Sequence, residues 1–257
     1  MSSKDIFKIF LIEGNKVLLK RETNDFELPL LNQFTEKDLI KIQKFGLYSN
    51  YLIAGLESEA IIPEGFNWIP VREVSRTCEN EVIRNSAFAA YQINWDLQTT
   101  FCGRCGNRTE TKDEERAKVC PNCGLVVYPR ISPAIIVAIV KDGELLLAHN
   151  SNFPAGFYSV LAGFMNPEES FEECVKREVR EEVGISLKNI KYFGNQPWPY
   201  PDSHMVAFTA EYESGEIVVD NDEISAADWY KPDLLPKIPE RNSISRSLID
   251  WFVEKYS

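Results

Sequence analysis

The sequence contains no apolar run long enough to cross a membrane, and it has no surplus of basic residues. Its 28 Lys and Arg residues are outnumbered by 39 Asp and Glu residues, which gives a net charge of -11 at pH 7. This balance excludes a general nucleic-acid coat protein, because binding to phosphate backbones needs clustered basic side chains. It suits a protein that binds cations. Neither end carries a secretory or lipidation signal, so we expect a cytoplasmic protein with no membrane partner.

Histidine is also scarce. The two histidines, His149 and His204, lie outside any metal-binding or catalytic motif, so we expect them to be surface or hydrogen-bonded residues. Hydrophobic residues make up 44% and charged residues 26% of the 257 positions, which is typical of soluble globular proteins. The length allows one large domain or two smaller ones, each with its own core.

Cysteine is rare outside residues 102–124, which read CGRCGNRTETKDEERAKVCPNCG. Four thiols form two C-x2-C pairs in this segment: Cys102, Cys105, Cys120 and Cys123. The spacing predicts a tetrahedral zinc site between two tight turns, with positive φ expected at Gly103, Gly106 and Gly124. Two disulfides are the alternative, which a reducing cytoplasm disfavours. Four thiolates would close the coordination shell, so we predict a structural zinc ion. Cys78 and Cys174 are expected to be ordinary buried or half-buried residues.

The cysteine segment divides the chain into three predicted parts. Residues 1–98 read as an N-terminal α+β module, residues 99–128 as a zinc ribbon and residues 129–257 as a larger α/β domain. In the larger domain a hairpin over residues 131–150 turns at an Asp-Gly pair, and residues 157–163 read as a strand. Further strands and a C-terminal amphipathic helix follow. The pattern predicts a mixed sheet with helices on its faces, in the α/β or α+β class.

The clearest secondary-structure signal is a helix over residues 171–183. Ser170 can cap its N-terminus in a capping box with Glu173, and Gly184 is placed to end it. Three valines at i, i+4 and i+8 predict a buried stripe: Val175, Val179 and Val183. Two pairs on this helix, Glu172–Lys176 and Glu173–Arg177, are expected to be exposed i, i+4 ion pairs.

Three glutamates lie within five positions of this helix, Glu178, Glu181 and Glu182. They share one face, where like charges destabilise an isolated helix. A bound divalent cation reverses that repulsion, because carboxylate oxygens are the ligands that Mg²⁺ prefers. Spacing alone leaves two interpretations open, a metal-binding face and an ordinary solvated acidic face.

The residues around the glutamates resemble a known motif. Residues 163–185 read GFMNPEESFEECVKREVREEVGI and match the Nudix box, G-x5-E-x7-R-E-U-x-E-E-x-G-U with U aliphatic, at all nine specified positions. These positions are Gly163, Glu169, Arg177, Glu178, Val179, Glu181, Glu182, Gly184 and Ile185. The resemblance implies a Nudix α/β/α sandwich with a mixed sheet. It also implies a hydrolase that uses Mg²⁺ or Mn²⁺ to cleave a nucleoside diphosphate linked to another group.

The same resemblance implies roles for individual residues. The catalytic cations are expected to bind Glu178, Glu182, the backbone carbonyl of Ala162 and, outside the box, Glu223. Glu181 assists or acts as the general base, although we favour Glu182 as the base. Arg177 and Glu169 are expected to pair with each other and orient the loop. Bound cations neutralise the pyrophosphate and lower the pKa of a coordinated water.

A second motif lies at residues 195–203, NQPWPYPDS, where three prolines restrict the backbone and predict a rigid loop. Trp198 and Tyr200 offer flat faces for stacking on a base or a nicotinamide ring. A rigid connector with its aromatics packed on the core is the alternative. The segment resembles SQPWPFPxS, with Asn195 in place of Ser and Tyr200 in place of Phe. Together with the upstream ribbon, it resembles the NADH pyrophosphatase branch, also known as NAD-capped RNA hydrolases.

This branch implies a set of substrate contacts. They are Arg72, Tyr128, Phe164, Gln196, Pro197, Trp198, Pro199, Tyr200, Pro201, Asp202, Ser203 and Ser245. Phe164 would stack on the nicotinamide, Arg72 would reach a phosphate and Ser245 would contribute a main-chain contact. Phe164 and Tyr128 as core aromatics, and Glu223 as a turn carboxylate, are the alternatives.

The implied activity is hydrolysis of the NAD(H) pyrophosphate to nicotinamide mononucleotide and AMP. On RNA with a 5′ NAD cap, the same cleavage would leave a 5′-monophosphate RNA. The resemblance also implies a homodimer in which Trp198 reaches across the interface. Two alternatives are a nucleotide-sensing module with a non-catalytic Nudix domain, and a Nudix hydrolase of ADP-ribose or dinucleoside polyphosphates. The intact box disfavours the first and the proline-rich motif disfavours the second.

Overall fold

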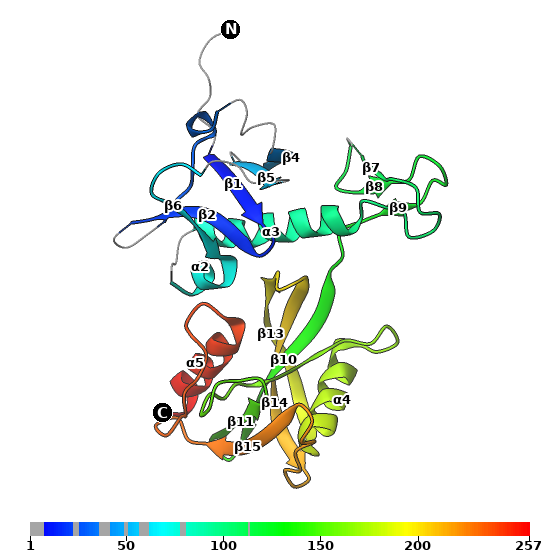
Figure 1. Ribbon diagram of the computed structural model, residues 1–257. Coiled ribbons are helices and arrows are strands. Elements are labelled where there is room, and N and C mark those ends of the chain that lie inside the picture. Colours follow the sequence, from blue (N-terminus) through cyan, green and yellow to red (C-terminus); the bar gives the residue numbers. More distant parts are fainter. Residues whose placement is uncertain are drawn as a thin grey trace. The chain divides into compact units, whose positions relative to one another are not determined.

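The chain forms two compact units, each described here by itself. A computed structural model describes residues 8–22, 26–35, 42–48, 51–56, 62–77, 81–112 and 114–257. The first unit is Met1–Arg130 with Pro199–Pro201, and the second is Ile131–Trp198 with Asp202–Ser257. Most of the first unit is coloured blue to green in Figure 1, and the second green to red. The prediction for Cys78 lies outside the described residues.

The first unit is built on a mixed sheet with strand order β3-β2-β1-β5-β4, in which β6 pairs with β2. The strands are β1 (Lys8–Glu13), β2 (Lys16–Arg21), β3 (Phe26–Glu27), β4 (Ile42–Tyr48), β5 (Tyr51–Leu56) and β6 (Phe66–Pro70). Strands β1 and β5 run parallel, and the other pairs are antiparallel. The helices are the short 3-10 helix η1 (Leu31–Gln33), α2 (Val71–Thr77) and α3 (Glu81–Gln98).

Both faces of this sheet are buried, because successive side chains of a strand point to opposite sides. Phe10 and Ile12 of β1 pack on one side with Ile93 of α3. Ile9 and Leu11 point the other way into a second cluster of buried side chains. Helix α3 therefore covers one face of the sheet.

The ribbon continues from α3 as three short strands in the order β7-β8-β9. They are β7 (Glu110–Thr111), β8 (Lys118–Val119) and β9 (Val126–Val127). The ammonium of Lys118 lies 2.6 Å from the carboxylate of Asp96 on α3, and both side chains are largely buried. The guanidinium of Arg116 lies over the ring of Phe88, 5.0 Å from its centre. Since a buried charge without its partner is costly, the ion pair holds the ribbon against the helix.

The second unit contains a mixed sheet with strand order β13-β14-β10-β11-β15, and β12 pairs with β10. The strands are β10 (Ser132–Lys141), β11 (Glu144–Asn150), β12 (Leu161–Phe164), β13 (Ser186–Trp198), β14 (Ser203–Ser214) and β15 (Ile224–Tyr230). Strands β10 and β14 run parallel, and the other pairs are antiparallel. As predicted, Asp142 and Gly143 form the turn between β10 and β11, with φ of 49° and 81°.

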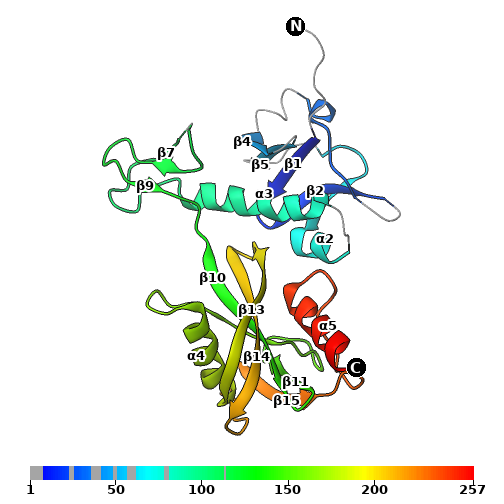
Figure 2. The ribbon, with the colours of Figure 1, turned by 180° about the vertical axis from the view of Figure 1, so that it is seen from behind.

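Two helices, α4 (Phe171–Val183) and α5 (Ile244–Tyr256), cover opposite faces of this sheet (Figures 1 and 2). Ile135 and Val137 of β10 pack with the valine stripe of α4. Ile136 and Ala138, which alternate with them, pack with Phe252 of α5. The sequence-based prediction of a Nudix α/β/α sandwich is confirmed. Among the residues that the structure describes, no helix combines the length and hydropathy of a membrane span.

The helix predicted over residues 171–183 has those bounds in the structure. One strand differs from its predicted extent. The strand predicted at residues 157–163 begins only at Leu161, because Phe157 and Ser159 make isolated bridges rather than a ladder. The strand β13 continues to Trp198, because its register with β14 extends to the end of the hairpin.

Candidate active site and zinc site

The four predicted zinc ligands converge within the ribbon. All four sulfur atoms lie within 4.8 Å of one another. The Sγ atoms of Cys102 and Cys123 are 3.6 Å apart, and those of Cys105 and Cys120 are 3.4 Å apart. These separations exceed a disulfide bond of about 2.05 Å, so the disulfide alternative is not observed. Zn–S bonds of about 2.3 Å place tetrahedral ligands about 3.8 Å apart, so the sulfur spacing fits zinc.

The two cysteine turns share one backbone geometry. The N–H of Gly106 donates to the carbonyl of Cys102, and that of Gly124 donates to Cys120, each at 2.9 Å. Both glycines have positive φ, 73° and 71°. The corresponding prediction for Gly103 was wrong, because only the fourth residue after each first cysteine turns left-handed here.

One ribbon thiol is tuned towards its thiolate form. The side-chain amide of Asn107 donates to the sulfur of Cys105 at 3.5 Å. This donor is the main reason that the pKa of Cys105 falls to about 5. A thiolate is the form that binds zinc.

The loop and helix of the Nudix box are fixed by their own caps. Ser170 Oγ accepts from the N–H of Glu173, and the Glu173 carboxylate accepts from the N–H of Ser170 at 2.8 Å. Neither of the two ion pairs expected on this fully described helix forms: Glu173 is engaged in the capping box, and Arg177 binds other carboxylates. Gly184, with φ of 75°, ends the helix and donates to the carbonyl of Arg180. The stripe residues are fully buried: Val175, Val179 and Val183.

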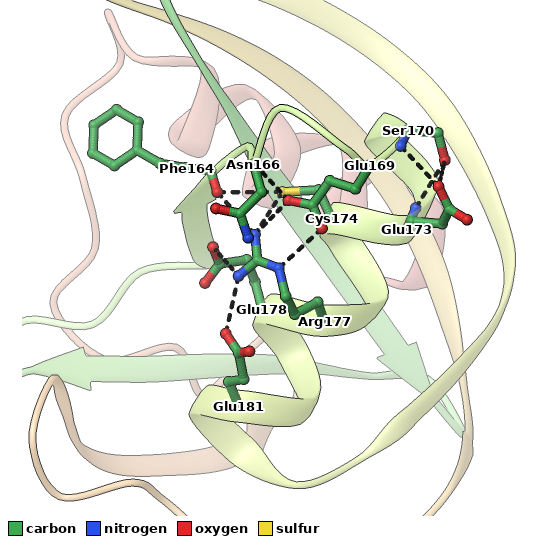
Figure 3. Close-up of polar contacts among 9 residues, drawn as sticks. All are labelled: Phe164, Asn166, Glu169, Ser170, Glu173, Cys174, Arg177, Glu178 and Glu181. Carbon is green, nitrogen blue, oxygen red and sulfur yellow. Dashed lines mark hydrogen bonds and ion pairs between the residues drawn. The ribbon is translucent and has the colours of Figure 1, made fainter.

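Arg177 lies at the centre of this loop and helix (Figure 3). Its Nε and Nη2 donate to the two carboxylate oxygens of Glu169 at 2.9 and 2.5 Å. Its Nη1 donates to Glu178 at 2.8 Å and to Glu181 at 2.9 Å. The guanidinium lowers the pKa of Glu169 to about 2. The predicted pairing of Arg177 with Glu169 is confirmed, and the same guanidinium also orients two of the candidate catalytic glutamates.

Gly163 leaves room for one of those glutamates. A Cβ atom at this position would lie 2.0 Å from the carboxyl carbon of Glu178 and 2.3 and 2.4 Å from its oxygens. Any other residue at position 163 would therefore collide with that carboxylate. The first glycine of the box is explained by this approach rather than by an unusual φ.

Glu182 is the most buried of the three glutamates, with 4% of its surface exposed. Its Oε2 atom is buried and has no hydrogen-bond partner. Burial, reinforced by the negative charges of Glu178 and Glu223, raises the pKa of Glu182 to about 8. Burial also raises the pKa of Glu178, although Arg177 opposes the shift. A buried carboxylate among other carboxylates needs a proton or a cation, so these residues fit a divalent metal.

An open cavity of about 70 Å³ lies beside these groups. Its lining includes three of the predicted ligand residues, Ala162, Glu182 and Glu223, together with Asn150 and Phe153. In the described part of the chain, only the ribbon cysteines bring three or more metal-ligand atoms within 4.8 Å of one another. The carboxylates do not meet this spacing, and Mg²⁺ commonly retains water and substrate oxygens as ligands.

The segment at residues 195–203, predicted as a rigid loop, comprises the end of β13, a turn over residues 199–202 and the start of β14. Gln196, Pro197 and Trp198 belong to β13, and proline is tolerated there because β13 is an edge strand. Both ends of the Gln196 amide bond to the start of α5. Its Nε2 donates to the carbonyl of Asn242 at 3.0 Å, and its Oε1 accepts from the N–H of Ile244 at 2.8 Å. Gln196 therefore joins the hairpin to α5.

The rest of this segment is divided between the units. Pro199, Tyr200 and Pro201 group with the first unit, where Tyr200 is half-buried and packs against the core. Asp202 and Ser203 belong to the second unit, and Ser203 is buried at the start of β14.

The other predicted substrate residues differ in exposure. Phe164 ends β12 with 58% of its surface exposed, and its ring points away from the Arg177 cluster (Figure 3). Tyr128 directly follows β9 and is also exposed. Arg72 is exposed in α2, whereas Ser245 is buried in α5. Arg72 and Tyr128 belong to the first unit, and Phe164 and Ser245 belong to the second.

Both histidines are hydrogen-bonded, as predicted. His149 Nδ1 lies 2.7 Å from the carbonyl of Phe157, and His204 Nε2 lies 3.1 Å from Asn195 Oδ1. Cys174 is fully buried, also as predicted.

The neighbours of Glu223 were not predicted. The side-chain amide of Asn150 donates to Glu223 Oε1 at 3.1 Å. The carboxylate of Asp220 accepts from the backbone N–H groups of Glu223 and Ile224. Asn150 is separated from Glu223 by 73 positions, so no spacing pattern connects them. The Asn-Asp turn composition around Asp220 was the only local signal available.

Residues 129–252 match the NUDIX domain family, and residues 98–128 match the NADH pyrophosphatase zinc ribbon domain family. Fold and site together thus define a Nudix domain preceded by a zinc ribbon. Over 250 residues, the chain is 41% identical to the NAD-capped RNA hydrolase NudC of Pseudomonas aeruginosa strain LESB58, which covers 96% of this chain and 87% of that protein. The chain belongs to the NudC family of NAD-capped RNA hydrolases.

One further relative and one solved structure are also similar to this chain. The NAD-capped RNA hydrolase NudC of Pseudomonas fluorescens strain Pf0-1 is 40% identical over 251 residues, with 96% of this chain and 87% of that protein covered. A crystal structure of a NUDIX hydrolase from Nitrosomonas europaea has a TM-score of 0.53 and 18% identity, and covers 61% of this chain and 91% of that chain. The latter similarity supports the fold.

Proposed function

We propose that the chain hydrolyses the pyrophosphate bond of NAD(H) to nicotinamide mononucleotide and AMP. We also propose that it removes 5′ NAD caps from RNA and leaves 5′-monophosphate RNA. The observation that carries the proposal is the open cavity where Ala162, Glu182 and Glu223 meet. Membership of the NudC family supports NAD as the common part of both substrates.

The catalytic chemistry needs Mg²⁺ or Mn²⁺, which supplies a Lewis acid for the phosphate oxygens and an acidified water. Glu178, Glu182, Glu223 and the carbonyl of Ala162 would hold these ions. Arg177 orients the carboxylates of Glu178 and Glu181, and Glu181 assists the other ligands.

We assign Glu182 as the general base. Its buried Oε2 has no hydrogen-bond partner, so this atom is available to accept the proton of the attacking water. Burial and the neighbouring carboxylates raise the pKa of Glu182 to about 8, and a bound cation would lower it again.

Substrate recognition is proposed to use the exposed ring of Phe164, which offers a flat face to the nicotinamide. Trp198 offers a second aromatic face, and Gln196 keeps the hairpin in place by holding α5. Arg72 would contact a phosphate, Tyr128 would line the pocket and Ser245 would act through its main chain. The proposed contacts also include Pro197, Pro199, Tyr200, Pro201, Asp202 and Ser203.

We further propose a homodimer in which Trp198 of one copy completes the site of the other. The enzyme is proposed to act in the cytoplasm, where a reducing environment keeps the ribbon thiols available for zinc. Sedimentation at several protein concentrations tests the dimer, and a monomer with full activity would contradict the shared site.

The test of the activity compares initial rates on NADH, ADP-ribose and a short 5′-NAD-RNA, each with Mn²⁺, Mg²⁺ or EDTA. We expect metal-dependent release of nicotinamide mononucleotide that is much faster than any cleavage of ADP-ribose. Glu178→Gln should abolish this release, whereas Glu172→Gln, on the exposed side of the same helix, should retain it. Binding without turnover would identify a nucleotide sensor, and faster cleavage of ADP-ribose would identify a different Nudix hydrolase.

A further inference from the structure

Glu223 is an exposed residue in the turn before β15, yet its carboxylate is held in a defined position. Its neighbour in sequence Asp220 binds the backbone of Glu223, because the Asp220 carboxylate accepts from the Glu223 N–H. The side chain itself is held from β11, where Asn150 Nδ2 lies 3.1 Å from Glu223 Oε1. Both residues line the cavity that contains Glu182 and Ala162.

The orientation of the Asn150 amide is determined by a second hydrogen bond. Its Oδ1 accepts from the backbone N–H of Asn152 at 2.9 Å. A backbone N–H can only donate, so the oxygen end of the amide must face Asn152. The NH₂ end must then face Glu223, and it can only donate to the carboxylate.

Backbone pairing also holds Asn150 in place beside Glu223. Strand β11 pairs with β15 across an irregularity, in which His149 pairs with Ala226 and Asn150 pairs with Ile224. Bulges of this kind redirect side chains at functional sites. The N–H of Ser151 donates to the carbonyl of Glu223 at 2.9 Å, so the two segments are also joined beside the side-chain contact.

A neutral amide orients a carboxylate without neutralising it. Arg177 pairs with Glu169, Glu178 and Glu181, and it offsets their negative charge. Asn150 instead leaves the full negative charge of Glu223 available to a cation. It also occupies only one side of Oε1, so the remaining lone pairs of the carboxylate are free for the cavity.

We propose that Asn150 is a positioning residue for Glu223, which it presents to the divalent cation in the cavity. The inference rests on the proposed function, in which Glu223 is a cation ligand. Asn150 acts through Glu223 and does not itself bind the metal. Hydrogen-bond partners of metal ligands typically change metal affinity by about 10- to 100-fold when they are removed.

The test measures Mn²⁺ binding to the full-length, substrate-free protein by the electron paramagnetic resonance signal of free Mn²⁺. The variants are Asn150→Ala, Glu223→Gln, the double variant and the matched control Asn152→Ala. Asn150→Ala should weaken Mn²⁺ binding on the order of tenfold, and Asn152→Ala should leave it unchanged. The double variant should bind no more weakly than Glu223→Gln alone. Turnover of NADH by Asn150→Ala should approach the wild-type kcat at saturating Mn²⁺.

The results distinguish a failure of the Asn150 inference from a failure of the proposed Glu223 metal ligand. Wild-type Mn²⁺ affinity in Asn150→Ala, or additive losses in the double variant, would overturn the inference and leave the proposed function standing. Wild-type affinity in Glu223→Gln would remove Glu223 from the proposed metal site and overturn the inference with it. Thermal unfolding and zinc content report whether each variant is folded. If Asn150→Ala does not fold, Asn150→Ser replaces it, because its short side chain cannot reach both partners.

Discussion

Replacing Gly163 with alanine is a direct test of how closely the Nudix loop must approach its helix. The added Cβ would lie 2.0 Å from the carboxyl carbon of Glu178, whereas ordinary contact begins near 3.4 Å, so the carboxylate would have to retreat by about 1.4 Å. The obstructing atoms belong to the far end of a flexible side chain, so the fold should persist. The candidate cation ligand would nevertheless be displaced.

A misplacement of about 1 Å in a catalytic group can cost roughly a hundredfold in rate. We therefore expect kcat for NADH to fall about a hundredfold, which corresponds to a barrier higher by about 2.7 kcal/mol. The assay follows release of nicotinamide mononucleotide at saturating Mn²⁺, with thermal unfolding measured in parallel. Gly194→Ala is the matched control, because its Cβ would meet only the Ile244 side chain at 3.9 Å. A Gly163→Ala variant with wild-type kcat would refute the argument.

Three further predictions concern charge and metal. The folded-state pKa of Glu182, about 8, lies above its ordinary value of 4.5, so its stabilising contribution is present below pH 4.5 and is lost as the pH rises through 8. Glu182→Gln should therefore raise the Tm at pH 8.5 in EDTA and change it little at pH 4, while abolishing turnover; equal Tm shifts at both pH values would contradict this. Arg177→Lys should lower kcat/KM for NADH about tenfold or more, because lysine lacks the fork that serves three carboxylates, and Arg180→Lys on the same helix should not. Cys105→Ser should lose bound zinc by metal analysis and lower the Tm, whereas Cys174→Ser should keep its zinc; retained zinc in Cys105→Ser would remove that residue from the site.

The parts of the site that could be predicted depend on short-range sequence relations. Each C-x2-C pair places two sulfurs on one turn, so a four-sulfur site forms once the two turns face each other. The helix at residues 171–183 combines a capping box, a terminal glycine and a periodic valine stripe, and each signal independently indicates the same bounds. The same periodicity places Glu178, Glu181 and Glu182 together on one face of the helix.

The parts that could not be predicted depend on distant neighbours. The prolines around Trp198 read as a loop because proline disrupts central strands. Only the sheet order shows that β13 is an edge strand, where proline is tolerated. The contact of Gln196 with α5 spans 46 and 48 positions, and the contact of Asn150 with Glu223 spans 73. No local pattern encodes such pairs, because they arise from how strands and helices pack.

The valine stripe of α4 has a consequence for how this chain can change during evolution. Helix residues advance by about 100° each, so inserting or deleting one residue after Val175 would rotate all that follow by that angle. Glu182 would swing off the cavity side, Glu178 would leave its place beside Gly163, and the later valines would swing out of the core. The helical register that buries the valines also positions the glutamates, so a shift in register would affect both stability and catalysis. Substitutions can accumulate on the exposed side of the helix, but insertions or deletions between Ser170 and Gly184 would not be tolerated.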